Sequence, residues 1–381
     1  MKPLSPLVEA MPRSGIRELM ARATLVPDAI RLETGEPSFP TPAHIIDAAF
    51  HDAQAGYTKY TAGGGLLSLR EVLAAHTSRA WGRPVAVENV MVTHGAVGAL
   101  MSVVLALLDD GDEVLVPDPC WPNYLNIVKM GRATAVPFSM RAEAGYLPDL
   151  AEMRALITPR TKAIMINTPG NPTGAVFPPE LVKGLVDLAI EHDLYLVSDE
   201  VYEALVFEGQ HFSTAQCDLQ HVIAISSVSK TYAMTGWRLG WAVGDPKVIA
   251  LATKLHEMLL SCPSSVSQRA AEAALTGPQD SVAQMRDAYR ARRDLVVDLL
   301  KAHDLLGSVP HGAFYAMVDL RHLRRPSLEL ALALLDEQHV AVAPGSTFGQ
   351  VAEGMVRISL AAADDQLREG CRRIITFAGR G

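Results

Sequence analysis

Short apolar runs alternate with amphipathic helical patterns from about residue 85 to residue 245 of this 381-residue chain. The runs that we expect to be strands are residues 90–93, 113–116, 133–136, 163–167, 195–198, 222–226 and 239–243, and we expect a helix over residues 96–108. Strands that alternate with helices build a mostly parallel sheet with helices packed on its faces. This stretch therefore predicts an α/β domain.

The pattern changes after Pro246, where long helical stretches begin, including one over residues 281–302. Further strands are expected at residues 313–320, 339–343 and 355–360, followed by a helix from Asp364. We therefore expect an N-terminal arm and part of a small domain at 1–44, a large domain at 45–285 and a small α+β domain at 286–381. The proline-rich arm cannot form a core alone, so it is expected to pack on the small domain or to reach another subunit.

Composition excludes several classes of protein. Apolar residues make up 49% and charged residues 20% of the chain, as in a globular protein, and the net charge of -8 gives no reason to expect nucleic acid as a partner. Prolines interrupt the N-terminal segment, and no run of about 18 apolar residues occurs, so neither a signal peptide nor a membrane span is expected. The four cysteines form no CxxC pair or metal-ligand spacing, which predicts no metal and a reducing cytoplasm.

The richest motif follows the apolar run at residues 222–226 and reads Ser227-Val228-Ser229-Lys230, with Arg238 eight positions on. A lysine at the end of a buried strand is partly desolvated, which lowers the pKa of its amine and favours a Schiff base. Serine hydroxyls and a guanidinium suit a phosphate group, so the aldehyde partner indicated is pyridoxal phosphate. The alternative is a surface lysine in a serine-containing turn.

Three other expected strands also end in polar residues, at the edge of an α/β sheet where ligands bind. The glycine turn at Gly95 opens a helix and offers backbone N–H groups to an anion. Asn171, in a turn-rich loop, can donate to a cofactor oxygen or only form an Asx-turn. Asp199 can pair with a protonated pyridine nitrogen or cap a helix.

Two further residues complete the set of candidates. Trp121 offers a flat face for an aromatic ring, although a core position is the alternative. Arg357 lies within an apolar strand, where an unpaired guanidinium is costly, so it needs an anionic partner. That partner is a substrate carboxylate or a structural Asp or Glu.

Taken together, these residues resemble the class I and II aminotransferases of the pyridoxal-phosphate fold type I superfamily. The resemblance covers nearly the whole chain, and its motifs are Gly35-Glu36-Pro37, Tyr57-Thr58-Lys59-Tyr60, Asn171-Pro172-Thr173-Gly174, Ser227-Val228-Ser229-Lys230 and Arg357. It implies a large domain with a mostly parallel, seven-stranded type of sheet flanked by helices, and a smaller α+β domain.

The resemblance also implies residue roles. Lys230 forms the aldimine and carries the proton, and Asp199 and Tyr202 complete the catalytic set. The cofactor-binding residues are Gly95, Ala96, Val97, Trp121, Asn171, Asp199, Tyr202, Ser227, Lys230, Arg238 and, from a neighbouring subunit, Tyr60. The substrate-binding residues are Gly35, Trp121, Asn171 and Arg357.

The activity implied is a ping-pong transfer of an amino group from an amino acid to a 2-oxo acid, in a homodimer with shared active sites. A cysteine-S-conjugate β-lyase on the same scaffold is the main alternative, and a non-enzymatic ligand sensor is the other. Some aspartate-specific relatives place a lysine at position 97 to bind the side-chain carboxylate. Val97 therefore argues against a dedicated aspartate enzyme.

Overall fold

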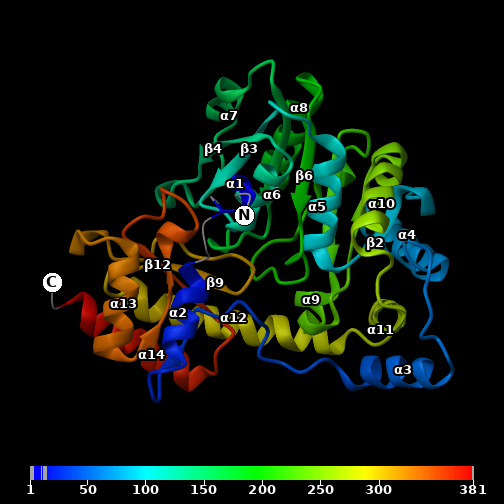
Figure 1. Cartoon of the computed structure of the whole chain (residues 1–381). Helices are drawn as coiled ribbons and strands as arrows, with labels where there is room; N and C mark the ends of the chain where they lie inside the picture. The colour runs from blue at the N-terminus through cyan, green and yellow to red at the C-terminus, as the bar shows by residue number, and fades with distance from the viewer. Residues whose placement is uncertain (1–3, 10, 12–14, 380–381) are drawn as a thin grey trace.

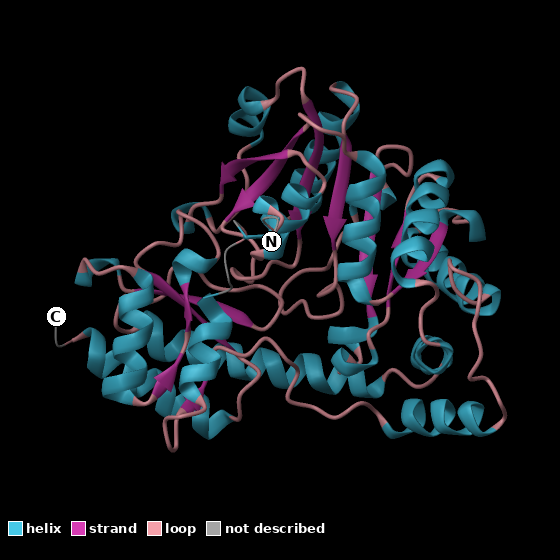
Figure 2. Ribbon diagram, in the orientation of Figure 1, coloured by secondary structure: helices cyan, strands magenta, loops and turns pink. Residues whose placement is uncertain are grey.

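Seven strands form the central sheet of the larger part of the molecule (Figure 2). The structure is a computed structural model that describes residues 4–9, 11 and 15–379. The sheet has the strand order β2-β8-β7-β6-β5-β3-β4. Its strands are β2 (Val90–Thr93), β3 (Glu113–Asp118), β4 (Thr134–Ser139), β5 (Thr161–Asn167), β6 (Tyr195–Asp199), β7 (Val222–Ser227) and β8 (Gly240–Val243). Only β8 runs antiparallel to its neighbours, which confirms the predicted α/β class with a mostly parallel sheet.

Helices cover both faces of this sheet, because alternate residues of its central strands point to opposite sides. Val114 and Val116 pack in one apolar cluster, and Leu115 between them packs in another. The helices α5, α6 and α10 supply the first cluster, and α7 and α8 supply the second. Two buried faces explain why the strands read as continuous apolar runs.

The helices appear in Figure 1 under these labels. Their bounds are α1 (Pro6–Glu9), α2 (Gly15–Ala23), α3 (Ala43–Gln54), α4 (Leu67–Trp81), α5 (Gly95–Leu107), α6 (Asn123–Met130), α7 (Leu150–Leu156), α8 (Pro179–Glu191), α9 (Val228–Thr231), α10 (Pro246–Leu260), α11 (Ser265–Thr276), α12 (Asp280–Lys301), α13 (Ser327–Gln338) and α14 (Asp364–Ala378). Among the described residues, no helix combines the length and the apolar character that crossing a bilayer requires.

A smaller three-stranded antiparallel sheet has the order β11-β12-β9. Its strands are β9 (Tyr315–Asp319), β11 (Ala343–Pro344) and β12 (Met355–Ser359). The single strand expected at residues 339–343 is instead two short strands, because β10 (Val340–Ala341) pairs with β1 (Ile30–Arg31) while β11 pairs with β12. The partner that separates them comes from the start of the chain, so local sequence could not reveal the break.

The predicted domain boundary near residue 285 falls inside α12, which extends in Figure 1 from beside α14 toward α9 and α11, below the central sheet. The division into three segments therefore stays a prediction. We call the part of the molecule that contains the small sheet, α13 and α14 the smaller unit. The N-terminal helix α2 packs against it, since Leu19 shares an apolar cluster with Leu334 of α13. This contact brings residues from the start of the chain beside the small sheet.

Leucines of α13 provide a test of this packing. Leu334 is fully buried, whereas Leu328 on the same helix is 40% exposed. We expect Leu334→Ala to lower the free energy of unfolding by about 2–5 kcal/mol, because it removes methylene groups and leaves a cavity. Leu328→Ala, the matched control, should change it by no more than about 0.5 kcal/mol. Urea unfolding of both variants checks this, and equal losses would contradict the packing described.

Candidate active site

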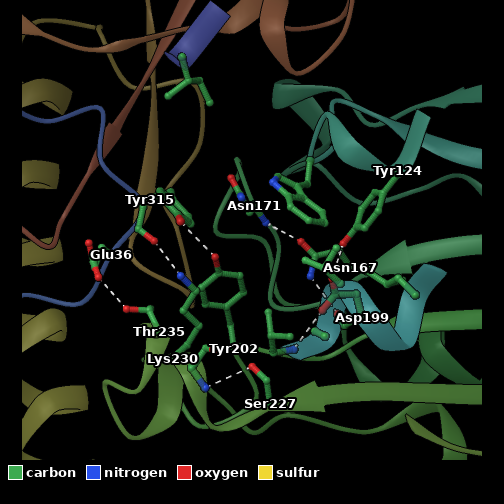
Figure 3. A pocket seen from close by; sticks show the side chains of 18 of the residues that line it. Glu36, Tyr124, Asn167, Asn171, Asp199, Tyr202, Ser227, Lys230, Thr235 and Tyr315 are labelled. Atoms are coloured by element: carbon green, nitrogen blue, oxygen red, sulfur yellow. Dashed lines mark hydrogen bonds between the residues drawn. The ribbon is translucent and has the colours of Figure 1, made fainter. Parts of the chain in front are cut away.

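A cavity of about 440 Å³ lies between the carboxyl ends of the central strands and the smaller unit (Figure 3). This volume falls in the range of small-molecule and cofactor sites. The residues predicted for the site line the cavity, with the exceptions of Gly95 and Tyr60. The register of the parallel strands explains why these residues come together. Asn167 at the end of β5 lies opposite Asp199 at the end of β6, and β7 ends at the same edge of the sheet.

Lys230 lies on the short helix α9, three residues after the end of β7. Its Nζ donates a hydrogen bond of 2.7 Å to the backbone oxygen of Gly35. Burial lowers the pKa of Lys230 to about 8, although the nearby carboxylate of Glu36 opposes the shift. A substantial fraction of the amine is therefore neutral near physiological pH, as a nucleophile or proton carrier requires.

Asp199 is 5% exposed at the end of β6. Its Oδ2 accepts a hydrogen bond of 2.6 Å from the Tyr124 hydroxyl, and its Oδ1 accepts one of 3.2 Å from the backbone N–H of Val201. Burial raises the pKa of Asp199 to about 6, and both hydrogen bonds oppose that shift. A turn follows Asp199, so it caps no helix, and its carboxylate remains available to a cation in the cavity.

An anion-binding corner surrounds the first turn of α5. Gly95 opens this helix with a φ of +68°, and a Cβ there would lie 2.7 Å from Nη2 of Arg238. Ser227 lies at the neighbouring strand end, where its Oγ accepts a 3.3 Å hydrogen bond from the Ser229 N–H. The free N–H groups of α5, including those of Ala96 and Val97, together with Arg238 form a cradle for a phosphate.

Arg357 is 3% exposed in the middle of β12. Its Nη1 donates to Oδ1 of Asn171 at 3.0 Å, and its Nη2 donates to the backbone oxygen of Glu33 at 2.6 Å. The Nε group has no hydrogen-bond partner among the described residues. The guanidinium also lies 4.3 Å from the centre of the Tyr315 ring. These hydrogen-bond partners are neutral, although the buried Glu33 carboxylate, which pairs with Arg31, also acts on the guanidinium through its charge. The Nε without a partner leaves a donor for a substrate carboxylate in addition to that structural Glu.

Aromatic side chains shape the rest of the wall. The hydroxyls of Tyr202 and Tyr315 lie 3.0 Å apart, and both side chains are buried (Figure 3). Gly35 approaches this pair so closely that a Cβ would lie 2.5 Å from the Tyr315 hydroxyl. Trp121 is half-buried, lines the cavity and meets Tyr124 edge to face, with ring centres 5.5 Å apart. Trp121 is therefore a wall residue rather than a core residue.

Tyr60 is 90% exposed and does not line the cavity of its own chain. It lies between α3 and α4, in a segment that also exposes Tyr57. The role of Tyr60 in a neighbouring subunit therefore stays a prediction.

Four residues that the sequence did not identify as part of the site form hydrogen bonds within it. Tyr124 bonds Asp199, Tyr315 bonds Tyr202, and the Thr235 hydroxyl donates to Oε1 of Glu36 at 2.6 Å. A weak signal existed for Tyr124, which follows Trp121 by three residues at the start of a helix. Tyr315 gave no signal, because an aromatic residue in an apolar strand is ordinarily a core residue.

These residues fit pyridoxal phosphate at three points. The space that a Cβ on Gly95 would fill, next to Arg238, suits its phosphate. The buried carboxylate of Asp199 suits its ring nitrogen, and the amine of Lys230 suits its aldehyde.

Comparison with known proteins agrees with this geometry. Residues 27–374 match the family model described as aminotransferase class I and II. The aspartate/prephenate aminotransferase of Thermus thermophilus is 40% identical over the full length of both chains. The arginine–pyruvate transaminase of Pseudomonas aeruginosa is 39% identical over 94% of this chain and 92% of its own.

Solved structures give the same result. The structure of the Thermus thermophilus aspartate aminotransferase with maleate matches with a TM-score of 0.95 and 39% identity, over 99% of this chain and 100% of its own. The aspartate aminotransferase of Rhizobium meliloti matches with a TM-score of 0.95 and 33% identity, over the whole of both chains. The chain therefore belongs to the class I and II aminotransferases, and it is a transaminase that uses pyridoxal phosphate.

Proposed function

We propose that this cavity moves an amino group from an amino acid to a 2-oxo acid in two half-reactions, with Lys230 as the proton carrier. Pyridoxal phosphate, when bound, supplies the aldehyde and an electron-withdrawing ring. The observation that carries the proposal is the buried Lys230 amine, with a pKa of about 8, in one cavity with the unpartnered Nε of Arg357. One group can move the proton of an α-carbon, and the other can hold the adjacent carboxylate.

Lys230 would take the proton from the α-carbon of the substrate and return it elsewhere in the same half-reaction. A pKa near the working pH lets one amine act as both base and acid. The Gly35 backbone oxygen, which accepts from Nζ, would orient the amine between these two tasks. Glu36 opposes the fall in the pKa of Lys230, so it keeps part of the amine protonated.

Other residues would hold the cofactor. Asp199, oriented by Tyr124, would keep the ring nitrogen protonated, and Asn171 and Tyr202 would contact the ring oxygen. Trp121 would lie against the ring. The phosphate would lie at the start of α5, held by Gly95, Ala96, Val97, Ser227 and Arg238.

Arg357 would bind the α-carboxylate of the substrate, with Asn171 and Gly35 beside it. The Nε of the buried guanidinium has no hydrogen-bond partner among the described residues, and the nearby Glu33 carboxylate is paired with Arg31, so an incoming carboxylate supplies further compensating charge. Because α-carboxylates occur in both amino acids and 2-oxo acids, the same contact serves both half-reactions.

We also propose a homodimer in which Tyr60 reaches the cavity of the partner. The support is the 90% exposure of Tyr60 and the apolar side chains exposed at the end of α10, where Met258 is 70% and Leu259 is 55% exposed. Exposed apolar side chains that gather on one surface mark an interaction site. A monomeric mass in sedimentation equilibrium would contradict this assignment.

A cytoplasmic location is proposed from the thiols. All four cysteines are free, and Cys120 and Cys371 are buried. Free thiols persist in a reducing compartment. Cell fractionation tests the location directly.

The side-chain end of the substrate would be apolar. Among the described residues, the cations that line the cavity are Lys230, Arg238 and Arg357, and each already has a role above. The remaining wall near the mouth includes Ile16 and Met20 from α2 and Val97 from α5. The relatives are named for aspartate, prephenate and arginine, so their names alone do not choose a side chain. We therefore propose apolar or aromatic amino acids as the preferred donors.

The first test is the half-reaction. Mixing the pyridoxal form with an amino donor should convert it stoichiometrically to the pyridoxamine form, whereas pyruvate and ammonia without that conversion would indicate the β-lyase alternative. Lys230→Ala should abolish turnover and leave the circular dichroism spectrum unchanged. The exposed Lys254 offers the matched control, and Lys254→Ala should keep full activity. DNA binding without any half-reaction would favour a sensor.

The second test concerns the carboxylate contact. We expect Arg357→Lys to raise KM for every amino donor by about tenfold or more, because a lysine cannot reproduce the planar set of donors. The exposed Arg368 on α14 provides the control, and Arg368→Lys should leave KM unchanged. An unchanged KM in Arg357→Lys would contradict the role, as long as thermal unfolding shows an intact fold.

The third test concerns the side chain of the substrate. Val97→Lys should raise kcat/KM for aspartate by about tenfold or more, because a charge-assisted hydrogen bond is worth roughly 1.5–3 kcal/mol. Val97→Met, which adds length without charge, is the control and should give no such gain. If the unmodified protein already prefers aspartate to leucine and phenylalanine, the apolar assignment is wrong.

A further inference from the structure

Glu200, the residue that follows Asp199 in the chain, forms a buried ion pair with His211. Glu200 is 2% exposed, and its Oε2 lies 2.9 Å from Nε2 of His211. Its Oε1 accepts hydrogen bonds from the Ser198 hydroxyl at 2.9 Å and from both the N–H and the hydroxyl of Thr214, at 3.1 and 3.0 Å. His211 is the only cation paired with Glu200 among the described residues.

This ion pair is outside the active-site cavity. Glu200 and Glu203 line a separate cavity of about 30 Å³, with His76 on its wall. Glu203 accepts a 2.7 Å hydrogen bond from the Ser226 hydroxyl. Burial alone would lower the pKa of His211, but the charges of Glu200 and Glu203 outweigh it and the net shift is upward. His211 is therefore stabilised as a cation in this surrounding.

Asp199 and Glu200 are consecutive and both are buried, so their charges interact with little screening by solvent. Burial raises the pKa of Asp199 to about 6, and the charge of Glu200 adds to the rise. The hydrogen bonds from Tyr124 and Val201 and the charge of Lys230 act in the opposite direction. The phenol of Tyr202 also lies within electrostatic range. Together these contributions leave the pKa of Asp199 at about 6. Near that pH, a change in a neighbouring charge alters the fraction of Asp199 that is ionised.

We propose that His211 is a positioning residue that acts through Glu200: its positive charge compensates the Glu200 carboxylate and so keeps Asp199 ionised for the ring nitrogen of the cofactor. This inference rests on the proposed role of Asp199. His211 itself lies outside the active-site cavity, so it touches neither substrate nor cofactor. Its effect passes along two adjacent residues of the chain, from Glu200 to Asp199.

The experiment measures cofactor dissociation from the holoenzyme as a function of pH, by absorbance of the bound cofactor after dialysis. In His211→Gln the uncompensated Glu200 raises the pKa of Asp199, so Asp199 is protonated and the cofactor is released at a higher pH. We call the fall in bound cofactor as the pH is lowered the acid limb of this profile. In His211→Gln we expect the acid limb to move to higher pH by about one unit. The matched control is His221→Gln, since His221 pairs with Asp218 and Asp193 rather than with Glu200.

Two further variants separate charge from packing. Glu200→Gln removes the negative charge itself, so alone it should move the acid limb downward. Combined with His211→Gln, it should return the limb to the wild-type position, which a purely structural role of His211 would not do. An unshifted limb in His211→Gln, or a double variant that stays shifted, overturns the proposal.

Asp199→Asn distinguishes this failure from a failure of the proposed function. The acid limb should disappear in Asp199→Asn, because the titrating group is gone. If the limb persists, the assignment of Asp199 to the ring nitrogen is wrong. If it disappears while His211→Gln has no effect, only the inference about His211 is wrong.

Discussion

The parallel register of β5, β6 and β7 is the constraint on which the site depends. It brings the ends of these strands to one edge, so that Asn167, Asp199 and Ser227 lie beside one another although they are far apart in the sequence. The helix α5 begins at the same edge and directs its free N–H groups there. Asn167, Asp199, Ser227 and Lys230 need no long flexible loop to meet, because each is at the end of a strand of this sheet or within a few residues of one.

Buried charge is the second theme, and it follows from the first. Lys230, Asp199 and Arg357 are removed from water, and burial is the largest cause of the shift in each pKa. Isolated buried charges are costly, so a site that holds several gains from a ligand with complementary charge. A cofactor with a ring cation and a phosphate, together with a substrate carboxylate, completes these charges. The same electrostatic argument extends to Glu200 and His211, which lie one residue and one contact further from the cavity.

Much of the fold and site could be predicted from local patterns. The alternation of strands and helices predicted the α/β class, which the sheet confirms. The polar residues that follow apolar runs predicted Lys230, Asp199 and Asn171 as site residues, and all three line one cavity. Tyr315 could not be found this way, and Tyr124 gave only a weak signal, because an aromatic residue in a helix or strand is ordinarily taken as a core residue whether or not its hydroxyl faces a ligand. The split between β10 and β11 was missed for a related reason, since it depends on pairing with β1 from the other end of the chain.

The sequence by itself determined which residue types stand at the ends of the strands and that a lysine follows hydroxyl groups there. These are local properties, set by periodicity and by the order of residues along the chain. Only the tertiary structure decided that Arg357 faces Asn171, that Tyr124 orients Asp199, and that Lys230 is buried enough to carry a pKa of about 8. Burial and hydrogen bonding depend on distant segments packing together, and a pKa follows from that packing rather than from the residue alone.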